Sequence, residues 1–169
     1  MKLRGLAVGA ALLAASALPA FAQDAVCSKL AWPLGKERAL LTGSVDLVPS
    51  GTTRKAMPDR ALSLMLKKGA DGLPVAPGKP ADATKFSGFV IVPVSAAGDY
   101  LVSLSSEGWI DAVQDGASLT STAHTGDEHC PGLRKSVRFT LGAKPLTLQI
   151  SNAPGDHVEI AITPAPPKP

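Results

Sequence analysis

Several features that point directly to a function are missing from this sequence of 169 residues. It has no Gly-x-Ser-x-Gly motif, no Walker loop, no dinucleotide-binding Gly-x-Gly-x-x-Gly and no EF-hand spacing, so the common hydrolase, nucleotide and calcium signatures are absent. Aromatic residues make up only 4% of the chain. Few rings therefore remain to form the exposed platform that a sugar-binding sandwich needs.

A strong charge of one sign is also missing. Seventeen Lys and Arg against 14 Asp and Glu give a formal charge of +3. Removal of an export signal at residues 1–22 would take away Lys2 and Arg4, leaving 15 basic against 14 acidic residues and a charge of about +1. So small a charge argues against nucleic acid as a partner.

Long apolar runs are absent except at the N-terminus. Residues 6–18 are apolar or small, follow a short cationic start, and precede Ala20-Phe21-Ala22, the small-x-small pattern that signal peptidase reads. We interpret residues 1–22 as a signal peptide and expect a periplasmic or secreted protein. No later run approaches the ~20 apolar residues that span a bilayer, so no transmembrane segment is expected.

Cysteine is scarce, with Cys27 and Cys130 the only two in the chain. In an oxidising compartment a lone pair most simply forms a disulfide, which we predict here. The alternatives are lipidation of Cys27, for which the charge of Asp24 makes a poor signal, and two unpaired buried thiols.

What the sequence does contain is a period-two pattern, in which apolar residues alternate with polar or small ones. The apolar positions of the three clearest runs are Val137, Phe139 and Leu141; Leu146, Leu148 and Ile150; and Val158, Ile160 and Ile162. Such alternation predicts half-buried antiparallel strands, with Arg138, Gln149 and Glu159 on the solvent side. Short turns join the three runs, and the simplest arrangement for them is a meander.

Earlier runs at 41–47, 62–66 and 100–104 alternate in the same way, and residues 89–94 are apolar on both faces, which predicts a central strand ending near Pro93. About nine short strands separated by turn signals predict an all-β fold, an antiparallel, jelly-roll-like β-sandwich. Helical evidence is confined to a turn or two around residues 36–38.

We expect one β-sandwich domain over residues 23–163. Within it, residues 67–88 are rich in glycine and proline and predict a long surface loop. Residues 164–169 read Pro-Ala-Pro-Pro-Lys-Pro and predict a solvated tail of polyproline type.

Two stretches, 98–102 (Gly-Asp-Tyr-Leu-Val) and 108–111 (Gly-Trp-Ile-Asp), followed by alternating strands, resemble the bacterial pre-peptidase C-terminal domain. The likeness covers residues 86–164 and implies a small β-sandwich of secreted proteins. The whole chain is also similar to small exported bacterial proteins sometimes named homogentisate 1,2-dioxygenase. The enzyme of that name is a longer, cupin-type protein with an iron held by two His and a carboxylate. This chain has three His in total and no cupin His-x-Glu/Asp box. The name therefore does not imply that this chain has the dioxygenase activity.

The densest polar cluster lies at residues 124–131 and contains His124, Asp127, Glu128 and His129. Imidazoles and carboxylates bind Zn, Cu or non-haem Fe, and Gly126 and Pro131 favour a loop in which side chains can converge. His124, Glu128 and His129 are therefore candidate ligands of a divalent metal. The alternative is a solvated loop held by the disulfide.

Trp109 is a second candidate for binding, since it begins a strand and can be presented to solvent. A functional site is thus expected around Trp109 and the 124–129 loop, because a loop on a rigid sandwich commonly carries binding residues. His157 and Glu159 share a face of the last strand and are either an acid/base pair or exposed polar residues.

The sequence favours an exported, non-catalytic module without a resident cofactor that binds a small ligand or an envelope protein. The alternative is a metal-dependent enzyme, dioxygenase-like or a hydrolase, that uses the 124–129 loop. A third hypothesis is an accessory protein that presents the loop at 67–88 to a partner.

Overall fold

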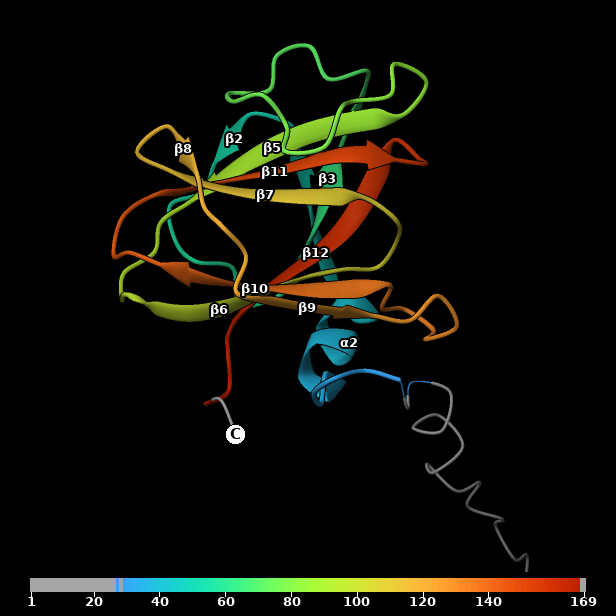
Figure 1. Cartoon of the computed structure of the whole chain (residues 1–169), viewed down its shortest axis with the longest axis vertical. Helices are drawn as coiled ribbons and strands as arrows, with labels where there is room; N and C mark the ends of the chain where they lie inside the picture. The colour runs from blue at the N-terminus through green and yellow to red at the C-terminus, as the bar shows by residue number, and fades with distance from the viewer. Residues whose placement is uncertain (1–26, 28, 168–169) are drawn as a thin grey trace, which may run out of the picture.

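The computed structural model describes Cys27 and residues 29–167, so the predicted signal peptide lies outside the described residues. This part of the chain forms twelve strands and one short helix. The strands make two sheets that face each other, which confirms the all-β sandwich (Figure 1). No helix in the described range is long and apolar enough to cross a membrane.

The first sheet has six strands in the order β1 (Val45–Pro49), β3 (Ala61–Met65), β12 (His157–Pro164), β6 (Gly98–Leu104), β10 (Lys135–Leu141) and β9 (Ala123–Gly126). The second has the order β2 (Thr52–Thr53), β5 (Phe86–Val92), β11 (Leu146–Ala153), β7 (Trp109–Gln114) and β8 (Ala117–Ser118), with β4 (Lys67–Lys68) also paired to β5. Both sheets are mixed and not wholly antiparallel as expected, because β1 is parallel to β3 and β2 is parallel to β5. Three strands have only two residues each, too few for an alternating pattern to be visible in the sequence.

The main core lies between the sheets. All the apolar positions of the three late runs are buried there, as the alternation predicts. Phe139 on β10 is 2% exposed and lies opposite Tyr100 on β6. Strand β5 ends at Val92, next to the predicted stop at Pro93.

The predicted meander of the last three strands is wrong. Strands β10 and β12 belong to the first sheet and β11 to the second, and no two of the three are paired. The chain thus crosses between the layers twice, and β6 lies between β12 and β10. A strand that crosses to the opposite sheet carries the same alternation as one that forms a hairpin, so the pattern does not distinguish them.

The first sheet is covered on its outer face, which corrects the predicted exposure of Arg138. Helix α2 (Gly35–Leu41) packs there in a second apolar cluster with Leu101 and Ala161 (Figure 1). Arg138 is 5% exposed, and its guanidinium lies 3.6 Å from the Asp99 carboxylate and 5.8 Å from the ring centre of Trp32. Residue 41, expected in a strand, ends α2 instead.

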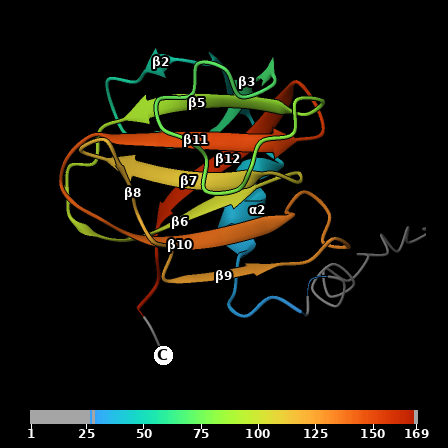
Figure 2. The same ribbon diagram turned by 45° about the horizontal axis from the view of Figure 1, so that its top comes forward.

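The second sheet is covered by the long loop, which crosses in front of β5, β11 and β7 (Figure 2). The loop spans residues 69–85 and is shorter than the expected 67–88, because β4 and β5 take up its two ends. Gln149, predicted to face solvent, is fully buried beneath it. The Gln149 amide accepts from the Val75 N–H at 2.9 Å and donates to the Val75 carbonyl at 3.1 Å. A polar side chain is therefore tolerated here because the loop satisfies both ends of its amide.

The proline-rich tail begins against the first sheet rather than in solvent. Pro164 is the last residue of β12, and the Ala165 N–H donates to the Asp99 carbonyl at 2.8 Å. Arg138 donates to the Pro166 carbonyl at 3.2 Å. These bonds need only one N–H from the tail, which a proline-rich segment with a single alanine can supply.

Candidate functional site

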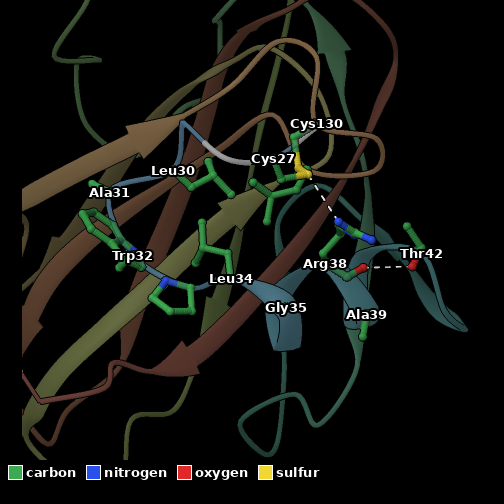
Figure 3. A pocket seen from close by; sticks show the side chains of 12 residues that line it. Cys27, Leu30, Ala31, Trp32, Leu34, Gly35, Arg38, Ala39, Thr42 and Cys130 are labelled. Atoms are coloured by element: carbon green, nitrogen blue, oxygen red, sulfur yellow. Dashed lines mark hydrogen bonds between the residues drawn. A yellow bond between two sulfur atoms is a disulfide. The ribbon is translucent and has the colours of Figure 1, made fainter. Parts of the chain in front are cut away.

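The predicted disulfide between Cys27 and Cys130 is confirmed, with a Cα–Cα distance of 4.8 Å. It joins the segment that precedes α2 to the turn that follows β9. The Arg38 guanidinium donates a hydrogen bond to the Cys27 sulfur at 3.3 Å (Figure 3). The described residues contain no free cysteine.

Asp127 shapes the turn that carries Cys130. Its buried carboxylate accepts from the His129 N–H at 3.0 Å, and its carbonyl accepts from the Cys130 N–H at 3.3 Å. The hydrogen bond from the His129 backbone holds the pKa of Asp127 below its ordinary value. Asp127 therefore acts as a turn residue that positions the cysteine.

The structure does not bring the predicted metal ligands together. His124 lies on β9 opposite Val137, so its side chain is on the inner face of the first sheet. Glu128 and His129 are exposed in the turn after β9. Among the described residues no three His, Cys, Asp or Glu side chains form a group able to hold a metal ion. The geometry gives the metal hypothesis no support.

His124 instead lines a cleft of about 590 Å³ at the open side of the sandwich. Here the chain leaves β8 in the second sheet and crosses to β9 in the first (Figure 1). The apolar floor of the cleft is formed by Ile110, Leu119, Val137 and Phe139, and its polar wall by Trp109, Asp111, Ser118, Thr120, Ser121, His124 and Lys135, with Gly78 at the rim.

The cleft exists because β8 is too short to cover β7. A two-residue turn, Asp115 (φ 52°) and Gly116 (φ 73°), brings β8 back along β7, where it pairs only with Val113 and Gln114. The Leu119 N–H then donates to the Ala112 carbonyl at 2.8 Å, and the chain departs toward β9. No strand of the described chain lies beside residues 109–111 on that edge.

Partly buried hydrogen bonds hold the Trp109 ring at the wall of the cleft. The Asp111 carboxylate accepts from the Trp109 indole N–H at 2.9 Å and from the Gly78 N–H at 3.2 Å. A side chain at Gly78 would place its Cβ 2.9 Å from the Asp111 carboxylate and 3.2 Å from the indole nitrogen. Glycine therefore permits the close approach that fixes the ring.

Lys135 places a cation at one end of the cleft. Its ammonium donates to the Gly108 carbonyl at 2.7 Å and lies 5.7 Å from the ring centre of Trp109. Burial lowers the pKa of Lys135, an effect that nearby Glu107 partly offsets. Sequence reasoning missed Lys135, although it occupies the same inward phase as Val137 and Phe139, and a charge at an inward position is the available signal.

A second pocket, of about 740 Å³, lies below the disulfide (Figure 3). Its lining includes Leu30, Trp32, Leu34 and Arg38. The cleft beside β7 combines an apolar floor with a fixed aromatic ring and an ammonium and is the stronger candidate.

The pair His157 and Glu159 does not share a partner. The Glu159 carboxylate accepts from the Ser105 hydroxyl and from the Ser63 hydroxyl, the latter at 3.4 Å. His157 is exposed and lies 2.9 Å from the Asp156 carboxylate. Glu159 thus links β12 to β6 and β3, and His157 belongs to the preceding turn.

The contact between His157 and Asp156 predicts a measurable change in the pKa of His157. The hydrogen bond that the His157 ring donates to the Asp156 carboxylate raises the pKa of His157 above its ordinary value, with a further contribution from Glu159. Any stability from this pair is complete below the ordinary imidazole pKa and is lost as the pH rises through the folded value. An NMR titration should show Asp156→Asn lowering the pKa of His157, while Asp59→Asn leaves it unchanged. Equal values in wild type and Asp156→Asn would contradict the assignment.

Comparison of the chain with protein-family models, curated proteins and solved structures finds no match. Of the five predicted site residues, the cleft contains Trp109 and His124, and the turn after β9 contains the other three. The geometry of the cleft carries the argument for function by itself.

Proposed function

We propose that this chain is an exported, non-catalytic binding module, and that the cleft beside β7 holds a small amphiphilic ligand with an anionic group. The observation that supports it is the composition of the cleft. Apolar residues such as Val137 and Phe139 form its floor, while a fixed aromatic ring and an ammonium stand at its mouth. Pockets of a few hundred Å³ with an apolar lining and a few placed polar groups are the usual form of ligand sites.

Export is supported by two independent features. The sequence begins with the pattern of a signal peptide, and the chain contains a disulfide, a bond that persists in oxidising compartments. The proposed location is the periplasm or the extracellular space. The resemblance to the pre-peptidase C-terminal domain agrees with a small exported sandwich and remains an expectation.

The polar groups of the cleft are held in fixed hydrogen bonds, which favours a binding role. Asp111, the one carboxylate in the lining of the described cleft, is engaged by Trp109 and Gly78.

Binding of 8-anilinonaphthalene-1-sulfonate tests the proposal, because this probe combines an apolar ring system with an anionic group. We expect one saturable site per chain and a shift of the Trp109 indole N–H signal in NMR spectra. Ser121→Trp should fill the cleft and weaken binding at least tenfold. Ala83→Trp places the same ring on an exposed position of the long loop and should leave binding unchanged.

Two results would contradict the proposal. One is binding of the probe that is equally strong in wild type and Ser121→Trp. The other is a set of shifted signals that excludes Trp109, Ile110 and His124, since these residues line the cleft from β7 and β9.

A further inference from the structure

The main chain of β7 presents an unused hydrogen-bonding pair to the cleft. Gln114 flanks the two-residue turn opposite Ala117, and the Ala112 carbonyl accepts from Leu119, so both point toward β8. Backbone groups of a strand face alternate edges, and the N–H and C=O of Ile110 therefore point to the same edge. Since β8 ends at Ser118, no described strand meets Ile110 there.

The end of this open edge is closed by a cation. Gly108 lies two residues before Ile110, so its carbonyl points to the same edge of the sheet. That carbonyl accepts a hydrogen bond from the Lys135 ammonium at 2.7 Å. A strand added beside Ile110 would therefore meet the ammonium after about one residue. The space is suited to the end of a chain, not to the middle of one.

The direction of the added strand decides which end arrives at Lys135. A strand antiparallel to β7 runs in the direction of β8, from Gln114 toward Gly108. Its carboxyl terminus then reaches the ammonium. A parallel strand would bring an α-ammonium to the same place, where two cations would repel each other.

We propose that the cleft binds the carboxyl terminus of a partner polypeptide, whose last residue pairs with β7 in the antiparallel sense. The residues before it leave the sheet, because Leu119 already occupies the place beside Ala112. The last residue of the partner pairs with Ile110, its N–H donating to the Ile110 carbonyl. Its α-carboxylate accepts from the Ile110 N–H and from Lys135. This inference rests on the proposed function, because it names the ligand class of the same cleft, and it is a form of recognition by strand addition.

The floor of the cleft fits the side chain of that last residue. Residues opposite each other in an antiparallel pair project to the same face of the sheet. Ile110 projects into the core, so the side chain of the bound residue would lie over Val137 and Phe139. An apolar terminal residue is therefore expected.

The charges around Lys135 favour an anion. Arg134 and Glu107 form a pair at 2.7 Å, and Lys79 adds a further positive charge near Lys135. The Asp111 carboxylate is already engaged by Trp109 and Gly78. A carboxylate beside Lys135 also compensates the burial that lowers the pKa of this lysine.

The described part of the protein's own tail, residues 165–167, is held away from the cleft. Ala165 binds the Asp99 carbonyl, and Pro166 accepts from Arg138, whose side chain lies on the outer face of the first sheet with α2 and Trp32. The tail is thus held on the side of that sheet away from the cleft. The proposed occupant is therefore the carboxyl terminus of another polypeptide.

Affinity selection with two peptide pools tests the inference. Both pools contain acetylated tetrapeptides randomised at all four positions, one ending in a free carboxylate and the other in a carboxamide. We expect the full disulfide-bonded protein to enrich only the carboxylate pool, with apolar terminal residues. For the best peptide, amidation, N-methylation of the terminal peptide nitrogen and the variant Lys135→Met should each weaken binding at least tenfold. The melting temperature of Lys135→Met serves as the control for folding.

The outcomes separate this inference from the proposed function. Equal enrichment of both pools, or of neither while the cleft still holds the anilinonaphthalene sulfonate, overturns the peptide inference and leaves a ligand cleft. An unchanged affinity after N-methylation also overturns it, since pairing with the Ile110 carbonyl needs that N–H. Failure of the sulfonate probe and of both pools would remove the proposed function as well.

Discussion

Replacing Cys27 and Cys130 together by serine should lower the free energy of unfolding by about 4–5 kcal/mol, before any strain in the native bridge is subtracted. The bond joins residues 103 apart in the sequence. A crosslink across so long a loop removes much of the conformational entropy of the unfolded chain, which is the main source of the effect in the chain-entropy model. Urea unfolding of the oxidised wild type and the double variant measures the difference.

The wild type unfolded in the presence of a reductant is the matched control, because it loses the same bond without a change of sequence. The reduced wild type and the double serine variant should unfold at the same urea concentration. If the free energy of unfolding of the double variant fell by less than ~1 kcal/mol, the unfolded chain would gain little conformational entropy when the disulfide is absent. Since domains of this size are stable by about 5–15 kcal/mol, the expected loss is a large share of the total.

Phe139→Ala is expected to cost about 3–5 kcal/mol, because it removes a buried ring and leaves a cavity between the sheets. Phe139 is 2% exposed and belongs to the main core. The same substitution at Phe89, which is only partly buried on β5, is the matched control and should cost clearly less. Urea unfolding measures both changes, and equal losses at the two sites would contradict the placement of Phe139 in the core.

The sequence predicts which residues of each strand point inward, but it does not predict which strands pair with each other. Alternation places Phe139 and Ile150 inside because it reports only which face of a strand is apolar. It carries no information on whether the next strand pairs with this one or lies in the opposite sheet. The meander failed for that reason, since β11 crosses to the second sheet.

Outer faces were harder to predict than inner ones. A polar residue at an outward position predicts exposure only if nothing covers that face. Arg138 lies under α2 and Trp32, and Gln149 lies under the long loop, and each is buried with hydrogen-bonding partners. Both covers are segments with little periodicity of their own, so the sequence pattern did not reveal where they would pack.

The candidate site was predicted in part. The sequence singled out Trp109 and His124, which line the same cleft from β7 and β9. It grouped His124 with Glu128 and His129 because they are close along the chain. On a strand that ends at Gly126, however, nearness in sequence does not bring side chains to one point. Ile110 contributes through its main chain, which no side-chain pattern can indicate.

The open edge of β7 also bears on how copies of this protein behave toward one another. An exposed strand edge is a template on which identical chains can stack and aggregate, and natural proteins often guard such edges with an inward-pointing lysine. Lys135 stands at the end of the edge, with its ammonium on the Gly108 carbonyl. A second copy that brought its own edge here would bring a second ammonium as well. The protein can thus leave part of a sheet edge uncovered without aggregating through that edge.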